Sequence, residues 1–292
     1  MDLSVGGLGY AVARWLGYVA AFGLTGLATA AFIAPHEERL FARGMGIGAA
    51  GLALLSLCGR LAGQVATLLE PGQPVSLAVV GEALASRWGV RWERQGLAVL
   101  LAVMAVGVPQ PVRIARWTAA LAAGAVAFTL PLTGHALEFP AGPRWGTLAH
   151  GAHLLAGGIW LGSLAVLLAS LRRVPVEASA AEAVATWRRF SAVALVAGSF
   201  AMALGLVLAW VDVGGWSRLF GSAYGRILLL KLALLGGVVG LGAFHWRRVL
   251  PRLPDRAAWR TLVRSGSWEV TLAFVLLGVT ALLVATPPPA RP

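Results

Sequence analysis

Long apolar runs, separated by short breaks that carry arginine and proline, constrain this chain more than any other feature. Hydrophobic residues make up 58% of the 292 positions and charged residues only 12%, about half the charged share of ordinary soluble domains. A helix needs roughly 20 mostly apolar residues to cross a bilayer, so the chain has room for about seven to nine spans. The sequence therefore predicts an all-α integral membrane protein built as a bundle of transmembrane helices.

The breaks divide the chain into eight predicted spans. They lie near residues 9–34, 44–69, 92–108, 115–136, 146–170, 190–211, 225–246 and 268–286. The connection over residues 75–87 mixes apolar with charged side chains and is expected to lie along the membrane interface. We expect one polytopic domain over residues 1–286 and a disordered tail over 287–292, because consecutive prolines cannot continue a helix.

The basic residues predict the orientation of the bundle. The chain has 24 of them, with Lys231 the lone lysine, and a net charge of +12. Fourteen lie in the connections after spans one, three, five and seven: Arg39, Arg43, Arg113, Arg116, Arg172, Arg173, Arg188, Arg189, Arg247, Arg248, Arg252, Arg256, Arg260 and Arg264. Because cytoplasmic loops are enriched in basic residues, both termini are expected to be periplasmic. Charges spread between apolar runs anchor helices, whereas a nucleic-acid partner would require a continuous basic face.

Several function classes are disfavoured by what the sequence lacks. The single cysteine, Cys58, excludes an internal disulfide and a multi-cysteine metal site. No serine or cysteine has a paired base at recognisable spacing, and no phosphate-binding glycine loop precedes a helix, so no enzymatic or ATP-driven activity is expected. The stretch Met1–Gly9 has no basic residue, so the first apolar run is expected to be a retained helix rather than a cleaved signal peptide.

Three of the five histidines are expected to converge near the outer face. His135 ends the fourth predicted span, and His150 and His153 open the fifth after a connection of about ten residues. His150 and His153 are three residues apart and therefore share a helix face, which Trp160 continues. Imidazole suits copper, zinc, iron and nickel, and a polar side chain at membrane depth is costly without a partner. The trio therefore predicts a metal site.

Other residues are candidates for supporting roles. Pro131 removes a backbone donor and is expected to loosen the helix before Gly134 and His135, and Glu138 could orient an imidazole. Met202 and Cys58 are soft ligands inside predicted spans, although such residues usually only fill space.

Two further pairs have both functional and structural interpretations. Lys231 lies inside the seventh span, where Asp212 is a candidate partner, and solvated anchoring explains the pair equally well. His36 and His245 adjoin arginine-bearing loops, where a polar residue needs no partner, so an exit site there is the less favoured interpretation.

An aromatic-glycine pair opens two of the predicted spans. Trp88-Gly89 begins the third and Tyr224-Gly225 the seventh, each followed within about two turns by a basic residue. This pattern hints at an internal duplication of four plus four spans.

The residue pattern alone leaves several functions open. Each histidine could sit singly at headgroup level, and a b-type haem carrier could use His135 or His150 as an axial ligand. A copper-binding scaffold or sensor would use the same site without net flux. An all-imidazole site also leaves the oxidation state open between Cu(I) and Cu(II).

Three motifs carry a resemblance to a known family. The run HGAHLLAGGIWLGSLAVLL at 150–168, the Gly-His-Ala element at 134–136 and Tyr-Gly-Arg with Lys231 at 224–231 resemble the CopD family of bacterial copper-resistance proteins. The resemblance is strongest over 130–287, where the Trp268-Glu269 helix also fits.

The resemblance implies an eight-span protein of the bacterial inner membrane that imports copper. It makes His135, His150 and His153 the expected copper ligands, with Trp160 and Lys231 as motif residues of unassigned role. It also implies a separate periplasmic CopC-like copper donor, because this chain has no segment long enough for a fused donor domain.

Overall fold

The computed structural model describes residues 5–34, 39–70, 72–108, 111–172, 180–253 and 255–289, and within these ranges every regular element is helical. The α-helices are α1 (Val5–Ile33), α2 (Arg39–Leu68), α3 (Leu77–Ala85), α4 (Arg87–Gly107), α5 (Val112–Thr129), α6 (Pro143–Gly157), α7 (Ser163–Leu171), α8 (Ala180–Val213), α9 (Trp216–Gly221), α10 (Ala223–Phe244) and α11 (Arg256–Ala285). Shorter helical segments of other types are η1 (Leu130–Thr133), η2 (His135–Glu138), η3 (Gly158–Gly162), η4 (His245–Val249) and η5 (Leu250–Arg252). The prediction of an all-α protein is confirmed.

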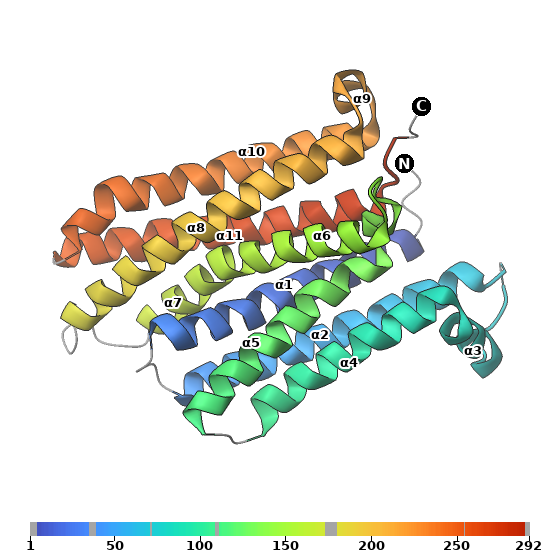
Figure 1. Cartoon of the computed structure of the whole chain (residues 1–292), viewed down its shortest axis with the longest axis horizontal. Helices are drawn as coiled ribbons and strands as arrows, with labels where there is room; N and C mark the ends of the chain where they lie inside the picture. Colours follow the sequence, from blue (N-terminus) through green and yellow to red (C-terminus); the bar gives the residue numbers. More distant parts are fainter. Residues whose placement is uncertain are drawn as a thin grey trace.

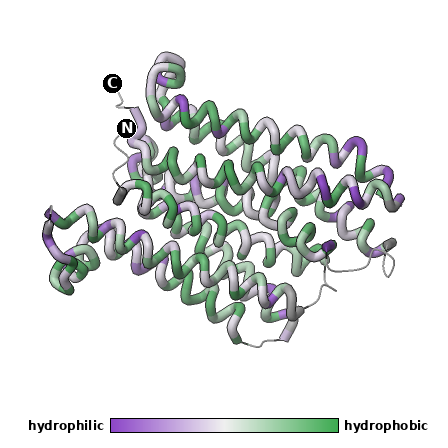
Figure 2. Tube along the Cα trace, turned by 180° about the vertical axis from the view of Figure 1, so that it is seen from behind, coloured by the Kyte–Doolittle hydropathy of each residue, from purple (hydrophilic) through white to green (hydrophobic). Residues whose placement is uncertain are grey.

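Seven helical stretches of the described chain are long and apolar enough to cross a membrane. They are Gly7–Ile33, Ala42–Leu68, Arg113–Thr133, Pro143–Leu171, Ala181–Val213, Ala223–Arg252 and Ala257–Ala285. Helix α4 is less apolar, because Arg87, Arg91, Glu93 and Arg94 lie in its first turns. It nevertheless packs against α2 and α5 and runs alongside them through the bundle (Figure 1). In Figure 2 hydrophobic residues dominate the middle of the bundle, and hydrophilic ones gather toward its ends.

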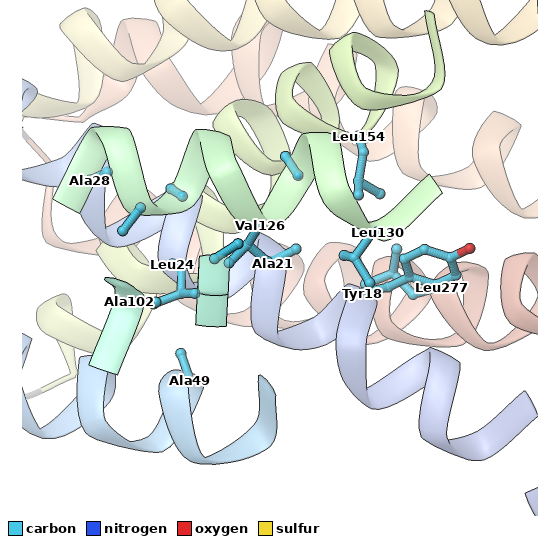
Figure 3. Packing of buried hydrophobic residues seen from close by; sticks show 14 of the residues in the cluster. Tyr18, Ala21, Leu24, Ala28, Ala49, Ala102, Val126, Leu130, Leu154 and Leu277 are labelled. Carbon is cyan, nitrogen blue, oxygen red and sulfur yellow. The ribbon is translucent and has the colours of Figure 1, made fainter. Parts of the chain in front are cut away.

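Helix α1 occupies the centre of the bundle, where it contacts α2, α5, α6, α7, α8 and α11. Small residues allow these close approaches: Ala21 and Ala28 of α1 share a buried cluster with Ala49 of α2 and Ala102 of α4 (Figure 3). Packing of small residues is how helices associate in lipid, where no hydrophobic force acts between them.

The two ends of the bundle differ. The start of α1, the end of α11, α3 and α9 lie at one end, which we call the α3/α9 end (Figure 1). The last turns of α1, α4, α7 and α10 lie at the opposite end (Figure 1). Helix α3 falls within the connection predicted to be interfacial, and its Leu77 is 91% exposed.

The fourth predicted span ends earlier than expected. Helix α5 stops at Thr129, and η1 and η2 carry the chain over residues 130–138, so His135 follows the helix instead of ending it. Pro131, which cannot donate a backbone hydrogen bond, lies at the start of η1 and explains the break. This part of the prediction, a loosened segment before Gly134 and His135, is confirmed.

Two helices extend farther than the predicted spans. Helix α8 begins at Ala180, whereas the prediction placed its start near 190, and α11 begins at Arg256, whereas the prediction placed it near 268. The arginines that suggested breaks lie on helical turns that also bury Trp187 and Trp259 in a shared apolar cluster. These first turns are therefore amphipathic and continue the helices beyond their apolar stretches.

Helices α4 and α10 begin in the same way. The Oγ atom of Ser86 accepts a hydrogen bond from the Gly89 amide, and Ser222 does the same for Gly225. A short helix precedes each start, α3 in one case and α9 in the other. This likeness is what an internal duplication predicts at these two positions.

Candidate metal site

A cavity of about 160 Å³ lies inside the bundle, toward the α3/α9 end. Residues of α1, α6, α8, α10, α11 and the η1–η2 segment line it. Its polar lining includes Arg14, Tyr18, His150, His153, Asp212, Tyr224, Lys231 and Thr280. At roughly 30 Å³ for each water molecule of the liquid, the space would hold a metal ion with several ligating waters.

In both histidines of α6, Nδ1 lies within hydrogen-bond distance of a backbone carbonyl oxygen. The Nδ1 atom of His153 lies 2.8 Å from the carbonyl oxygen of Ala201, and the Nδ1 atom of His150 lies 3.0 Å from that of Gly146. A carbonyl oxygen only accepts hydrogen bonds, so we assign the proton of each neutral ring to Nδ1. Each Nε2 then carries the lone pair that a metal ion requires, with the ring orientation set by the backbone.

Asp212 of α8 supplies a carboxylate to the same cavity. Its Oδ2 atom lies 4.0 Å from Nε2 of His150 and accepts a hydrogen bond of 3.2 Å from the hydroxyl of Tyr224. Lys231 lines the same cavity as Asp212 and the two histidines. Imidazole and carboxylate are donor types that borderline cations such as copper accept.

The segment with His135 borders this site. Gly134 and Ala136 line the cavity, and Gly146 of α6 packs so closely on the Ala136 carbonyl that a larger residue would collide with it. The side chain of His135 and the whole of His36 lie outside the described part of the chain, so the histidine trio stays a prediction. Among the described side chains, no group of three His, Cys, Asp or Glu residues is spaced to hold a metal ion.

Two buried arginines hold the η1 segment in place. Arg14 of α1 donates to the Thr133 carbonyl at 2.7 Å, and Arg60 of α2 donates to the Thr133 hydroxyl at 2.9 Å. Arg60 is 0% exposed and also donates to the side chain of Gln95 on α4. Sequence reasoning did not assign this network, although an arginine inside an apolar run is itself a signal, because such a residue is costly unless partnered.

Replacing Arg60 with alanine is expected to destabilise the fold. The change would leave the Thr133 hydroxyl and the buried Gln95 side chain without this donor, and unsatisfied buried polar groups cost about 1–3 kcal/mol each. Thermal unfolding in detergent should therefore show a clearly lower midpoint. Arg94→Ala, which removes an exposed arginine from α4, is the control and should leave the midpoint within about 1 °C of the native protein. Equal midpoints for both variants would contradict this role of Arg60.

Some of the remaining predicted site residues line the cavity, and others lie on the surface of the bundle. Trp160 lies in η3, a π-helical segment, and lines the cavity together with Met202 of α8. Cys58 is exposed on α2, and the side chain of Glu138 is exposed on η2. The structure thus brings Trp160, Met202 and Lys231 to the cavity that contains His150 and His153, whereas Cys58 faces outward.

Glycines of α8 make room for the aromatic side chains of the site. A Cβ atom at Gly205 would lie 2.6 Å from Cε1 of His153, and one at Gly198 would lie 3.0 Å from the Trp160 ring. The His153 ring therefore fits its position only because residue 205 lacks a side chain.

Gly205→Ala is expected to displace the His153 ring and weaken binding at the copper site that the sequence motifs imply. Altered support of a metal ligand typically weakens metal binding 10–100-fold, and we expect about a tenfold loss in a copper titration of the purified protein. Gly236→Ala on α10 is the matched control, because a Cβ there meets nothing within 4 Å. A native affinity in Gly205→Ala would show that the position of the ring is unimportant.

Comparison with known proteins extends this picture to both halves of the chain. The family model described as copper resistance protein D-like, N-terminal domain, matches residues 3–144, and the model described as copper resistance protein D matches residues 184–283. The chain belongs to the copper resistance protein D family. The resemblance seen in the sequence motifs is therefore confirmed.

A curated relative agrees with this assignment. The chain is 29% identical over 147 residues to the copper transport protein CutJ of Bacillus subtilis (strain 168). The aligned part is 50% of this chain and 27% of CutJ. The chain therefore matches only a minor part of CutJ. A copper-related role in a multi-pass membrane protein follows for the chain.

The family matches cover the site residues in part. His135 lies in the first matched range, and Asp212, Tyr224 and Lys231 lie in the second. His150 and His153 lie between the two ranges, so their assignment depends on the cavity geometry and on the sequence motif.

Proposed function

We propose that this chain carries copper across the bacterial plasma membrane, from the periplasm to the cytoplasm. One observation supports this above all: the imidazoles of His150 and His153 and the carboxylate of Asp212 line the same cavity between the helices of the bundle. The identity of the metal, copper, is inferred from the family to which the chain belongs. In this proposal His150, His153 and Asp212 bind the cargo, and His135 on the adjoining segment completes the ligand set. The chain itself catalyses no covalent chemistry.

The proposed orientation places the α3/α9 end, and with it the cavity, in the periplasm. Arg172, which follows α7, and the arginines of η4, η5 and the described first turns of α11 belong to the opposite end, which the positive-inside tendency assigns to the cytoplasm. We further propose that α4 is the eighth span, so that both termini are periplasmic. Its charged first turns would then lie at the periplasmic headgroup level, where polar residues are tolerated.

A separate periplasmic CopC-like protein is the proposed copper donor. A donor of this kind would deliver the ion at the α3/α9 end, close to the η1–η2 segment and the cavity. We further propose that a change in helix packing exposes the cavity first toward one side of the membrane and then toward the other.

Uptake into proteoliposomes tests the proposal. Vesicles that contain the purified native chain should take up copper faster than empty vesicles, and uptake should scale with the amount of protein. Bound copper without uptake would favour a scaffold or sensor and contradict transport. A Soret band that shifts on reduction would instead indicate a b-type haem protein.

A further inference from the structure

A second cavity, of about 240 Å³, is lined in part by η4 and η5 and so lies nearer than the first to the end of the bundle opposite α3 and α9. Trp160 and Met202 line both cavities and therefore lie between them. The second cavity also contains the side chains of His245, from η4 at the end of α10, and Glu269 of α11. Neither the copper-capture proposal nor the family matches assign a role to this pair.

The hydrogen bonds around His245 determine which ring nitrogen carries a proton. Ser265 has one hydroxyl proton, which it donates to the Thr261 carbonyl at 2.6 Å. The Ser265 oxygen therefore acts as acceptor toward His245 Nε2, 2.7 Å away, and the proton of the neutral ring belongs on Nε2. The Nδ1 atom then presents its lone pair to Oε2 of Glu269, at a distance of 2.9 Å.

Two lone pairs that face each other at this distance require a positive charge between them. Glu269 is 2% exposed, and among the described residues its Oε2 atom receives no hydrogen bond of regular geometry. A buried carboxylate without a compensating partner is strongly unfavourable. The pair is therefore arranged to hold a cation, either a proton or a metal ion.

The surroundings favour a metal ion that arrives from the first cavity. Trp160 and His245 both lie on π-helical segments, Gly158–Gly162 and His245–Val249, and such segments occur often at functional sites because they interrupt the regular helix. Met202 adds a thioether at the boundary between the cavities, and thioethers are good ligands for Cu(I).

We propose that His245 and Glu269 form a second copper site, which receives the ion after it passes Trp160 and Met202. The route of the cargo then runs through the part of the bundle formed by α6, α8, α10 and α11, and Trp160 separates the outer from the inner site. The copper ion keeps its oxidation state throughout. This inference rests on the proposed transport function, but binding alone can test it.

The copper stoichiometry of the purified chain tests the second site. The native protein, titrated separately with Cu(I) kept reduced and with Cu(II), should bind two copper ions. Glu269→Gln keeps the shape of the side chain and removes its charge, and should lose one of the two. His245→Asn should lose the same ion, and Glu93→Gln, which alters an exposed glutamate of α4, should keep both.

The outcomes separate this inference from the transport proposal. If Glu269→Gln and His245→Asn bind as much copper as the native chain, a proton holds the pair and the second site is refuted. If both variants lose one ion but the native chain moves no copper into vesicles, the second copper site is supported and the transport proposal is refuted. If transport is real, Glu269→Gln should also slow uptake by at least about tenfold while the outer site still binds copper.

Discussion

Replacing His135, His150 and His153 together with alanine is expected to abolish copper uptake by this protein. Two of these rings present unprotonated Nε2 atoms to the cavity, and their Nδ1 atoms are held by the carbonyls of Gly146 and Ala201. Removal of the imidazoles would leave Asp212 as the only strong ligand assigned to the outer site. Cellular copper, measured by elemental analysis, should fall to that of cells without the protein.

A control variant on the same helix makes this result specific. Leu148→Ala alters a side chain of α6 that is 50% exposed, so copper uptake should stay at the native level. The triple variant must also reach the membrane in native amounts, which a blot of the membrane fraction establishes. If the triple variant is correctly inserted and still takes up copper at the native rate, the three histidines do not form the outer copper site.

Asp212→Asn is expected to weaken copper binding at the outer site by about 10–100-fold, the range usual when a group beside a metal ligand is altered. The change removes the negative charge that lies 4.0 Å from His150 Nε2 and keeps the size of the side chain. Asparagine can still accept the hydrogen bond from Tyr224, so the fold should persist. A competition titration of the purified protein against a chelator of known affinity measures the loss.

Tyr224→Phe separates the charge of Asp212 from its position. This variant keeps the carboxylate and removes the hydroxyl that donates to it at 3.2 Å, so the loss of copper affinity should be smaller than for Asp212→Asn. Equal losses would mean that the hydrogen bond matters as much as the charge. Native affinity in Asp212→Asn would remove the carboxylate from the proposed ligand set.

The local pattern of the sequence was sufficient to predict the histidine face of α6. His150 and His153 were expected on one side of a helix, with Trp160 farther along, and all three line the same cavity. The break before His135 was also predictable, because Pro131 cannot donate a backbone hydrogen bond. Such features depend on spacing within one segment of chain, and helical geometry fixes that spacing.

Contacts between distant segments were not predictable in this way. Gly205 makes room for the His153 ring, and Ala201 orients it, although both belong to α8 and nothing in their own sequence marks them for these roles. The beginnings of α8 and α11 were placed too late because their arginines suggested breaks, whereas buried tryptophans on the same turns stabilise the helices.

The sequence by itself determined the membrane-spanning class, the family motifs and the placement of two histidines on one helix face. Only the tertiary structure joined Asp212 to those histidines and brought His245 against Glu269, 24 residues away in the sequence. The physical reason is that apolar content and helical periodicity act within a segment, whereas a ligand set depends on which faces of separate helices pack together. That packing is decided by small residues and buried polar groups distributed over the whole chain.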